Sequence, residues 1–215
     1  MSSEIYRSER FFLARQPILN RAQSLVAYEL LFRRAETGPA GVNDNLSASA
    51  SVILNTSSIG IDQVIGTALG FINVDAALLM SDVIDFLPAS RVVLEILETV
   101  KATPELLDRI TALRQVGYTF ALDDVVSETT DVRAFMPFVS IVKIDITDVS
   151  ASELRRLCAV FKRADKRLLA EKVETLEQFE IASRWDSAFS RDTISLARPF
   201  YKAKNSVRRS RPFSA

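Results

Sequence analysis

Acidic and amide side chains end or interrupt seven apolar runs along this chain. The runs cover residues 27–33, 71–75, 92–98, 120–125, 141–146, 168–174 and, more weakly, 188–194. Their polar members are Glu29, Asn73, Glu95, Glu98, Asp123, Asp124, Lys143, Asp145, Glu171 and Glu174. An unpaired carboxylate is costly to bury, so buried carboxylates are expected to be paired or bound to metal. Six successive strand ends that carry such groups predict a ring of oxygen ligands on one face of a barrel.

This set of oxygen donors predicts a site for hard divalent cations. One cation would be held by Glu29, Asn73, Glu95 and Asp123, and a second by Asp123, Asp124 and Glu171. Two cations about 3.5–4 Å apart can clamp a phosphodiester and activate water. Lys143, in a buried strand, needs negative charge beside it and could orient the water or offset charge on the phosphorus centre. The predicted chemistry is metal-assisted phosphodiester hydrolysis.

Several of these residues also fit purely structural roles. Glu98 and Glu174 fit a salt bridge at the rim or a helix cap equally well, and Asp145 could pair locally with Lys143. The adjacent carboxylates of Asp123 and Asp124 repel each other, so a positive group is expected beside them.

The composition restricts the possible chemistry. The chain has no histidine, which excludes the nucleophile arrangements that depend on one. With Cys158 as its single cysteine, an ordinary zinc site is not expected, and oxygen ligands favour Mg²⁺, Mn²⁺ or Ca²⁺. Lys+Arg and Asp+Glu both number 27, so no net charge points to DNA. The absence of a long apolar run, a signal peptide pattern and paired cysteines predicts no membrane span and a cytoplasmic location.

Strand-like and helix-like segments alternate along the chain. Expected strands are 11–18, 25–33, 69–75, 92–98, 119–125, 140–146, 167–173 and 188–195, and expected helices are 45–57, 77–87, 104–117, 151–164 and 175–183. The turn between the first two strands is too short for a helix, so they should pair antiparallel. Thr103 before Pro104, and Ser150 with Glu153, are helix start signals.

These elements predict an α/β fold, a TIM-like (β/α)8 barrel with an inverted first strand. An open doubly wound sheet is the alternative, although no glycine-rich dinucleotide motif follows any strand. We assign residues 10–200 to the barrel, 1–9 to an N-terminal extension and 201–215 to a basic tail or linker.

The motifs resemble, in order and spacing, those of the EAL domain of bacterial cyclic di-GMP phosphodiesterases over roughly residues 10–200. The matching segments are Gln16-Pro17-Ile18, Glu29-Leu30-Leu31-Phe32-Arg33, Asn73, Glu95 to Glu98, Asp123-Asp124, Val142 to Asp145, Ala170 to Thr175 and Arg198-Pro199. The sequences of the first two segments, 16–18 and 29–33, are most similar to those of the EAL subgroup that is often fused to HDOD domains.

The resemblance implies a role for each matching residue. Metal ligands would be Glu29, Asn73, Glu95, Asp123, Asp124 and Glu171; catalytic residues Lys143, Glu95 and Glu171; substrate-binding residues Gln16, Arg33 and Asp145. Glu98 would support the loop after Asp124. The family hydrolyses cyclic di-GMP with two Mg²⁺ or Mn²⁺ ions, and its members commonly form homodimers.

Three departures from the family pattern leave two functions open. The loop 126–132 lacks glycine, Asp192 stands where a supporting Gln is expected, and Lys172 replaces a Gly next to Glu171, with which it could pair. The surviving ligands and Lys143 favour hydrolysis with reduced activity. The departures favour a degenerate domain that senses cyclic di-GMP or acts as a protein-interaction scaffold. A barrel enzyme for another phosphorylated substrate is a third, more distant possibility.

Overall fold

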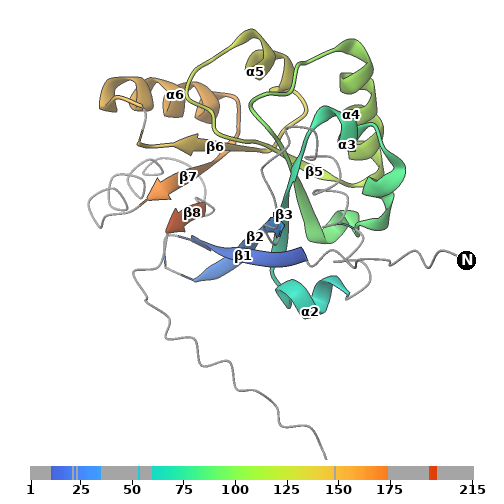
Figure 1. Cartoon of the computed structure of the whole chain (residues 1–215). Helices are drawn as coiled ribbons and strands as arrows, with labels where there is room; N and C mark the ends of the chain where they lie inside the picture. The colour runs from blue at the N-terminus through green and yellow to red at the C-terminus, as the bar shows by residue number, and fades with distance from the viewer. Residues whose placement is uncertain are drawn as a thin grey trace, which may run out of the picture.

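Eight strands close into a barrel in which neighbours in sequence are neighbours in space (Figure 1). The computed structural model describes residues 11–20, 22, 24–34, 53, 60–147, 149–173 and 194–197, with backbone alone for 11–14, 32–34 and 194–197. The strands are β1 (Phe11–Asn20), β2 (Leu25–Arg34), β3 (Leu69–Val74), β4 (Val92–Ile96), β5 (Thr119–Leu122), β6 (Ile141–Asp145), β7 (Arg167–Val173) and β8 (Ile194–Ala197).

The first strand runs opposite to all the others. β1 is antiparallel to β2 and to β8, whereas every other neighbouring pair is parallel. A short connection between β1 and β2 permits a hairpin but not a crossover, which explains the inversion. The predicted barrel with an inverted first strand is therefore confirmed, and the open sheet is excluded.

Short and medium helices lie outside the strands. They are α2 (Ile61–Ile65), α3 (Ala76–Leu79), α4 (Pro104–Val116), α5 (Thr130–Phe135) and α6 (Ala151–Arg163), with 3₁₀ turns η1 (Asp82–Phe86) and η2 (Ala89–Arg91). Thr103 caps α4, and Gly117 ends it in the left-handed conformation, as the sequence predicts. Across the described ranges, no helix has the length and apolarity needed to cross a bilayer.

The structure differs from several of the predicted elements. α2 and α5 were not predicted, because each is too short to show a helical period. At Ser150, the hydroxyl caps α6, but Glu153 pairs with Arg156 instead of completing a capping box. The last predicted strand, 188–195, overlaps β8 at residues 194 and 195, and its residues 188–193 lie outside the described ones. Apart from Ile53, the predicted helices 45–57 and 175–183 lie outside the described residues.

Alternation along the strands creates two stacked layers inside the barrel. One apolar residue from each of seven strands forms a buried cluster: Ile18, Ala27, Phe71, Val93, Ala121, Ile141 and Leu169. Side chains two residues apart in a strand point to the same face. The residues two positions closer to the carboxyl ends of the parallel strands therefore form the next layer. The side chains of this second layer are polar.

The opposite strand face packs against the helices. Leu94, Phe120 and Val142 from the strands share one buried core with Ile110 of α4 and Phe161 of α6. Burial on both strand faces makes the strands rigid supports for the polar layer, which suits a site that depends on precise side-chain positions.

Candidate metal centre

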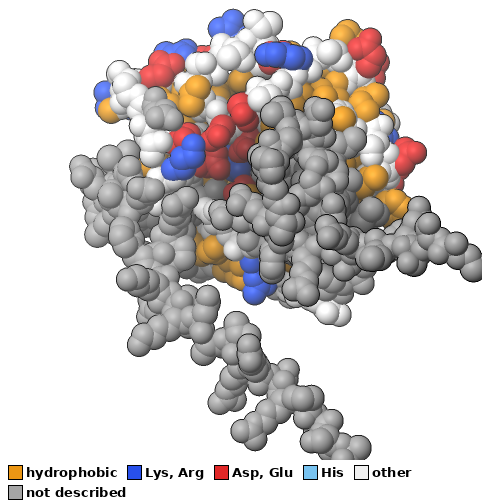
Figure 2. Space-filling view, in the orientation of Figure 1, with side chains coloured by type: hydrophobic (Ala, Val, Ile, Leu, Met, Phe, Trp, Pro, Cys, Tyr) orange, Lys and Arg blue, Asp and Glu red, His pale blue; other side chains and the backbone are white. Residues whose placement is uncertain are grey.

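The polar layer contains most of the predicted site residues. On their own strands, Glu29, Asn73, Glu95, Asp123, Lys143 and Glu171 each follow an apolar-layer residue by two positions. Gln16 belongs to the same layer but precedes its apolar-layer residue, Ile18, by two positions, because β1 is inverted. It pairs in register with Glu29. Functional groups in such barrels gather at the carboxyl ends of the strands. Figure 2 shows acidic side chains gathered near the middle of the face in view.

The Lys143 ammonium lies among four carboxylates. Its Nζ is 2.6 Å from Glu95 Oε1, 2.6 Å from Asp123 Oδ1, 2.9 Å from Glu171 Oε1 and 3.8 Å from Glu29 Oε2. Lys143 and Glu95 are both fully buried. Among the described side chains, this one ammonium leaves three negative charges uncompensated when all four carboxylates are ionised.

These contacts are close but are not aligned as hydrogen bonds. Among the described residues, Lys143 Nζ donates no hydrogen bond, and none is accepted by Glu95 Oε1 or Oε2, Glu171 Oε2, Asp123 Oδ1 or Asn73 Oδ1. Buried polar atoms are almost always satisfied, so a set of unpartnered oxygens around one point needs an explanation. A cation held by them would provide one.

The pKa shifts show that ionised carboxylates are unfavourable in this cluster when no cation is bound. Burial raises the pKa of Glu95 well above its usual value and raises that of Glu171 to about 8, although Lys143 acts in the opposite direction on both. Burial likewise raises the pKa of Glu29, against Lys143 and the Asn73 amide. Burial lowers the pKa of Lys143, but the surrounding carboxylates outweigh it, and the net pKa is well above usual. Lys143 therefore stays charged at neutral pH.

Stability without divalent cations should fall as the pH rises from about 4.5 to about 8. The Glu171 pKa is raised from 4.5 to about 8, so across this window the folded state binds more protons than the unfolded state. Each proton gives a slope of about 1.4 kcal/mol per pH unit. The raised pKa of Lys143 acts only above its usual 10.5. Urea unfolding in EDTA across this range measures the slope.

Added Mg²⁺ should reduce that slope, because a bound cation replaces the protons and stabilises most where the carboxylates are ionised. The control is Ala replacement of Asp108, an exposed acid on α4, which should leave the slope unchanged. Stability that rises with pH in EDTA would contradict the raised pKa of Glu171.

The donor set fits a hard divalent cation. Carboxylate and amide oxygens are the ligands that Mg²⁺ and Mn²⁺ prefer. Within the described part of the chain, however, no three acidic side chains form a ready-made cation cage; the Lys143 ammonium lies among them. The predicted metal ligands thus have suitable donor atoms and lie close together. Their role as ligands stays a prediction.

A second, smaller cluster lies beside the first. Lys172 Nζ bonds to Asp145 Oδ2 and is 3.6 Å from Asp124 Oδ1. Asp145 also accepts hydrogen bonds from the backbone N (2.9 Å) and hydroxyl (2.6 Å) of Thr147. Burial raises the pKa of Asp145, but these contacts outweigh it and hold the pKa below its usual value. Asp145 is 2% exposed, whereas about half of the Lys172 side chain is exposed.

Two predicted pairings are therefore wrong. Asp145 pairs with Lys172 rather than with Lys143, and Glu171 pairs with Lys143 rather than with Lys172. The reason is geometric, because Asp145 and Glu171 are in register on neighbouring strands, and each faces the lysine from the other strand. Thr147 was missed, although an Asp followed two residues later by Thr is a known local turn signal.

Residues 126–132, predicted as a loop without glycine, run into helix α5 at Thr130. Asp124 has a φ of 45°, and no non-glycine residue between 125 and 132 has positive φ. Glu128 bonds to Arg156 of α6 at 2.5 Å, and Asp131 accepts from Lys101 Nζ at 3.1 Å and from the Ala102 N–H at 3.0 Å. The loop is thus tied to its neighbours by ion pairs instead of by glycine turns.

The remaining predicted residues are less informative. Glu98 is exposed in the turn after β4 and makes no ion pair or hydrogen bond with a described residue, so its loop-supporting role stays a prediction. Arg33 lies in β2 opposite Phe12, but its side chain is outside the described set. Glu174 and Asp192 also fall outside it.

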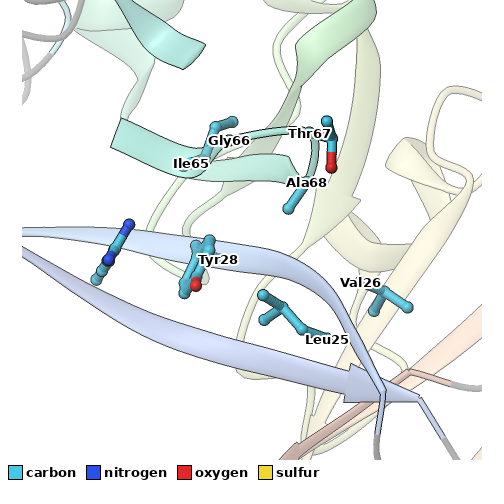
Figure 3. A pocket seen from close by; sticks show the side chains of 8 residues that line it. Leu25, Val26, Tyr28, Ile65, Gly66, Thr67 and Ala68 are labelled. Carbon is cyan, nitrogen blue, oxygen red and sulfur yellow. The ribbon is translucent and has the colours of Figure 1, made fainter. Parts of the chain in front are cut away.

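A groove elsewhere on the barrel does not involve the acidic ring. It is lined by Arg15, Leu25, Val26, Tyr28 and residues 65–68 (Figure 3). Arg15 donates to Val64 O at 2.5 Å and stacks over the Tyr28 ring, so its charge is already engaged. Nothing in this groove offers acid–base or metal chemistry, and the Lys143 cluster is the better candidate site.

Comparisons with known proteins agree with the geometry. Residues 2–189 match the family model of the EAL domain. The chain is 37% identical over 177 residues to the cyclic di-GMP phosphodiesterase CdgJ of Vibrio cholerae, covering 80% of this chain and 40% of CdgJ. It is 33% identical over 178 residues to YuxH of Bacillus subtilis, covering 80% and 44%. The chain therefore spans less than half the length of either relative.

The fold also matches a solved complex. The structure of Klebsiella pneumoniae BlrP1 with manganese and cyclic di-GMP superposes with a TM-score of 0.70 and 18% identity, covering 92% of this chain and 57% of that chain. At this identity the likeness shows a shared barrel fold.

Proposed function

Because the chain belongs to the EAL domain family, we propose that it binds cyclic di-GMP and hydrolyses it to linear pGpG with reduced activity. One observation carries the proposal: four carboxylates surround the buried Lys143 ammonium at the carboxyl ends of the barrel strands. CdgJ, a relative that matches four fifths of this chain, is a cyclic di-GMP phosphodiesterase.

The residues that would hold Mg²⁺ or Mn²⁺ are those of the polar layer. Glu29, Asn73, Glu95 and Asp123 would form one site, and Asp123, Asp124 and Glu171 a second. When bound, a divalent cation supplies Lewis-acid activation of water and stabilises negative charge on the phosphate. The unpartnered oxygens of Glu95 and Glu171 are available for this purpose.

Lys143 would position the attacking water. Its raised pKa keeps it an ammonium, so its N–H groups are available to donate to a water and it does not act as a base at neutral pH. Its fixed place among four carboxylates pre-orients the charge toward the reacting phosphate, and such pre-oriented charge is worth about 10²–10³ in rate.

Substrate binding would use groups on three strands. Gln16 lies in the polar layer opposite Glu29, where it could contact a guanine, and Arg33 lies further along the same strand as Glu29. Asp145 already has Lys172 and Thr147 as partners, so we propose that it acts on substrate through Lys172.

Sensing without cleavage is the second candidate function. The observation that favours it is that Lys172 lies beside Asp124, a predicted ligand of the second cation. A site that bound nucleotide but lacked part of its metal set would report cyclic di-GMP without consuming it. A scaffold role without nucleotide is the third outcome.

Assembly and location complete the proposal. We propose a homodimer in the cytoplasm, with an HDOD domain as a fused partner. Family membership motivates each of these, and a monomeric mass in sedimentation velocity would contradict the dimer.

Turnover and binding should be measured side by side. We expect linear product from cyclic di-GMP with Mn²⁺, and a loss of more than about 100-fold in Glu29→Ala, because a direct ligand matters more than an outer-sphere group. Asp108→Ala, an exposed acid on α4, is the matched control and should be fully active. Binding in Ca²⁺ without product in Mn²⁺ would support the sensor, and neither would support the scaffold.

A further inference from the structure

Two lysine ammonium groups lie among the acids at this end of the barrel. Lys143 lies among Glu29, Glu95, Asp123 and Glu171, and Lys172 lies between Asp145 and Asp124. The neighbouring acids Asp123 and Asp124 thus face different lysines. The sequence predicted a second divalent cation for Asp123, Asp124 and Glu171. Of these three ligands, Asp124 is the one that Lys172 faces, at 3.6 Å.

The two clusters differ in the charge that remains. Four carboxylates face one ammonium at Lys143, which leaves three negative charges and several buried oxygens without a hydrogen-bond partner. At Lys172, two carboxylates face one ammonium, and Asp145 has further donors in Thr147. The first cluster retains the charge and the free lone pairs that a divalent cation requires. The second keeps one negative charge, and Asp145 already has hydrogen-bond partners in Lys172 and Thr147.

The backbone holds Lys172 in this place. Its φ is 54°, in the left-handed region that residues other than Gly, Asn and Asp rarely adopt. Asp124, a residue type that tolerates this region, has a φ of 45°. Such strain persists only where surrounding contacts determine it, and it gathers at functional positions. From this backbone position the Lys172 ammonium reaches Asp124 and Asp145.

We propose that the Lys172 ammonium takes the place of one of the two divalent cations, so that the chain binds a single cation, at the Lys143 cluster. The inference rests on the proposed function, because it concerns the same site. A single-cation site explains how the acidic ring can persist while hydrolysis is reduced: charge at the second position is supplied by a fixed side chain that cannot activate water.

The test is the number of Mn²⁺ ions bound per chain, without nucleotide. Isothermal titration and electron paramagnetic resonance should give one ion for the wild type, with no signal from a coupled manganese pair. Lys172→Asn and Lys172→Gly remove the charge and tolerate positive φ, so both should bind two ions and show the coupled signal. Lys172→Arg keeps the charge and should bind one. Lys101→Asn, which breaks an ion pair with Asp131 outside both clusters, should also bind one.

The outcomes separate the inference from the proposed function. Two ions in the wild type would overturn the inference and leave the function standing. One ion in the wild type and in both charge-removing variants would show that Lys172 does not exclude the second ion, and would also overturn it. No ion in any variant would overturn the metal-dependent function itself.

Discussion

Replacing Lys143 with Met is expected to lower cyclic di-GMP hydrolysis by about 10²- to 10³-fold and the free energy of unfolding by about 3–5 kcal/mol near neutral pH. Lys143 is fully buried and is the ammonium around which Glu95, Asp123, Glu171 and Glu29 converge. Its removal leaves those of the four carboxylates that stay ionised at this pH without their compensating charge. Turnover with Mn²⁺ and urea unfolding in EDTA measure the two effects.

The destabilisation by Lys143→Met should shrink at acidic pH. The carboxylates then take up protons, and the uncompensated charge disappears. The control is Lys101→Met, which removes an exposed lysine that pairs with Asp131 and should change either quantity little. A Lys143→Met variant that is as stable as the wild type near neutral pH would show that the ammonium does not hold the cluster together.

Replacing Asp123 with Asn is expected to weaken Mn²⁺ binding by more than about 100-fold and to lower turnover accordingly. Asp123 belongs to both predicted cation sites and follows β5 directly, with its N–H bonded to Ile96 O at 3.0 Å. The substitution keeps the shape of the side chain but removes one charge. A loss of up to about 100-fold is typical of an outer-sphere partner, so a larger loss marks a direct ligand. Isothermal titration with Mn²⁺ measures it.

Asp131→Asn is the matched control for Asp123→Asn. Asp131 is an acid on α5, close in sequence, whose partners are Lys101 and the Ala102 N–H. We expect its Mn²⁺ affinity to equal that of the wild type. Unchanged affinity in Asp123→Asn would argue against the site, whether or not activity survived.

The fold could be predicted largely from local pattern. Continuous apolar strands that alternate with helical segments are typical of a parallel barrel, and the short connection after β1 predicts its inversion. The short helices α2 and α5 were not predicted, because five or six residues do not establish a helical period. The predicted helices near 45–57 and 175–183 stay untested, apart from Ile53.

The candidate site could be predicted in composition but not in pairing. The types and order of Glu29, Asn73, Glu95, Asp123 and Glu171 depend on residues within each strand, and the structure brings these residues together. Whether they bind metal, and whether the chain dimerises, are predictions that await the experiments above.

The sequence by itself determined that a polar layer would follow an apolar one inside a barrel, because the two-residue alternation of a strand is a local property. Only the tertiary structure decided which lysine faces which acid. That choice depends on the register between β6 and β7, and on the positive φ of Asp124 and Lys172. Register is set by the closure of the whole barrel, so no single segment encodes it.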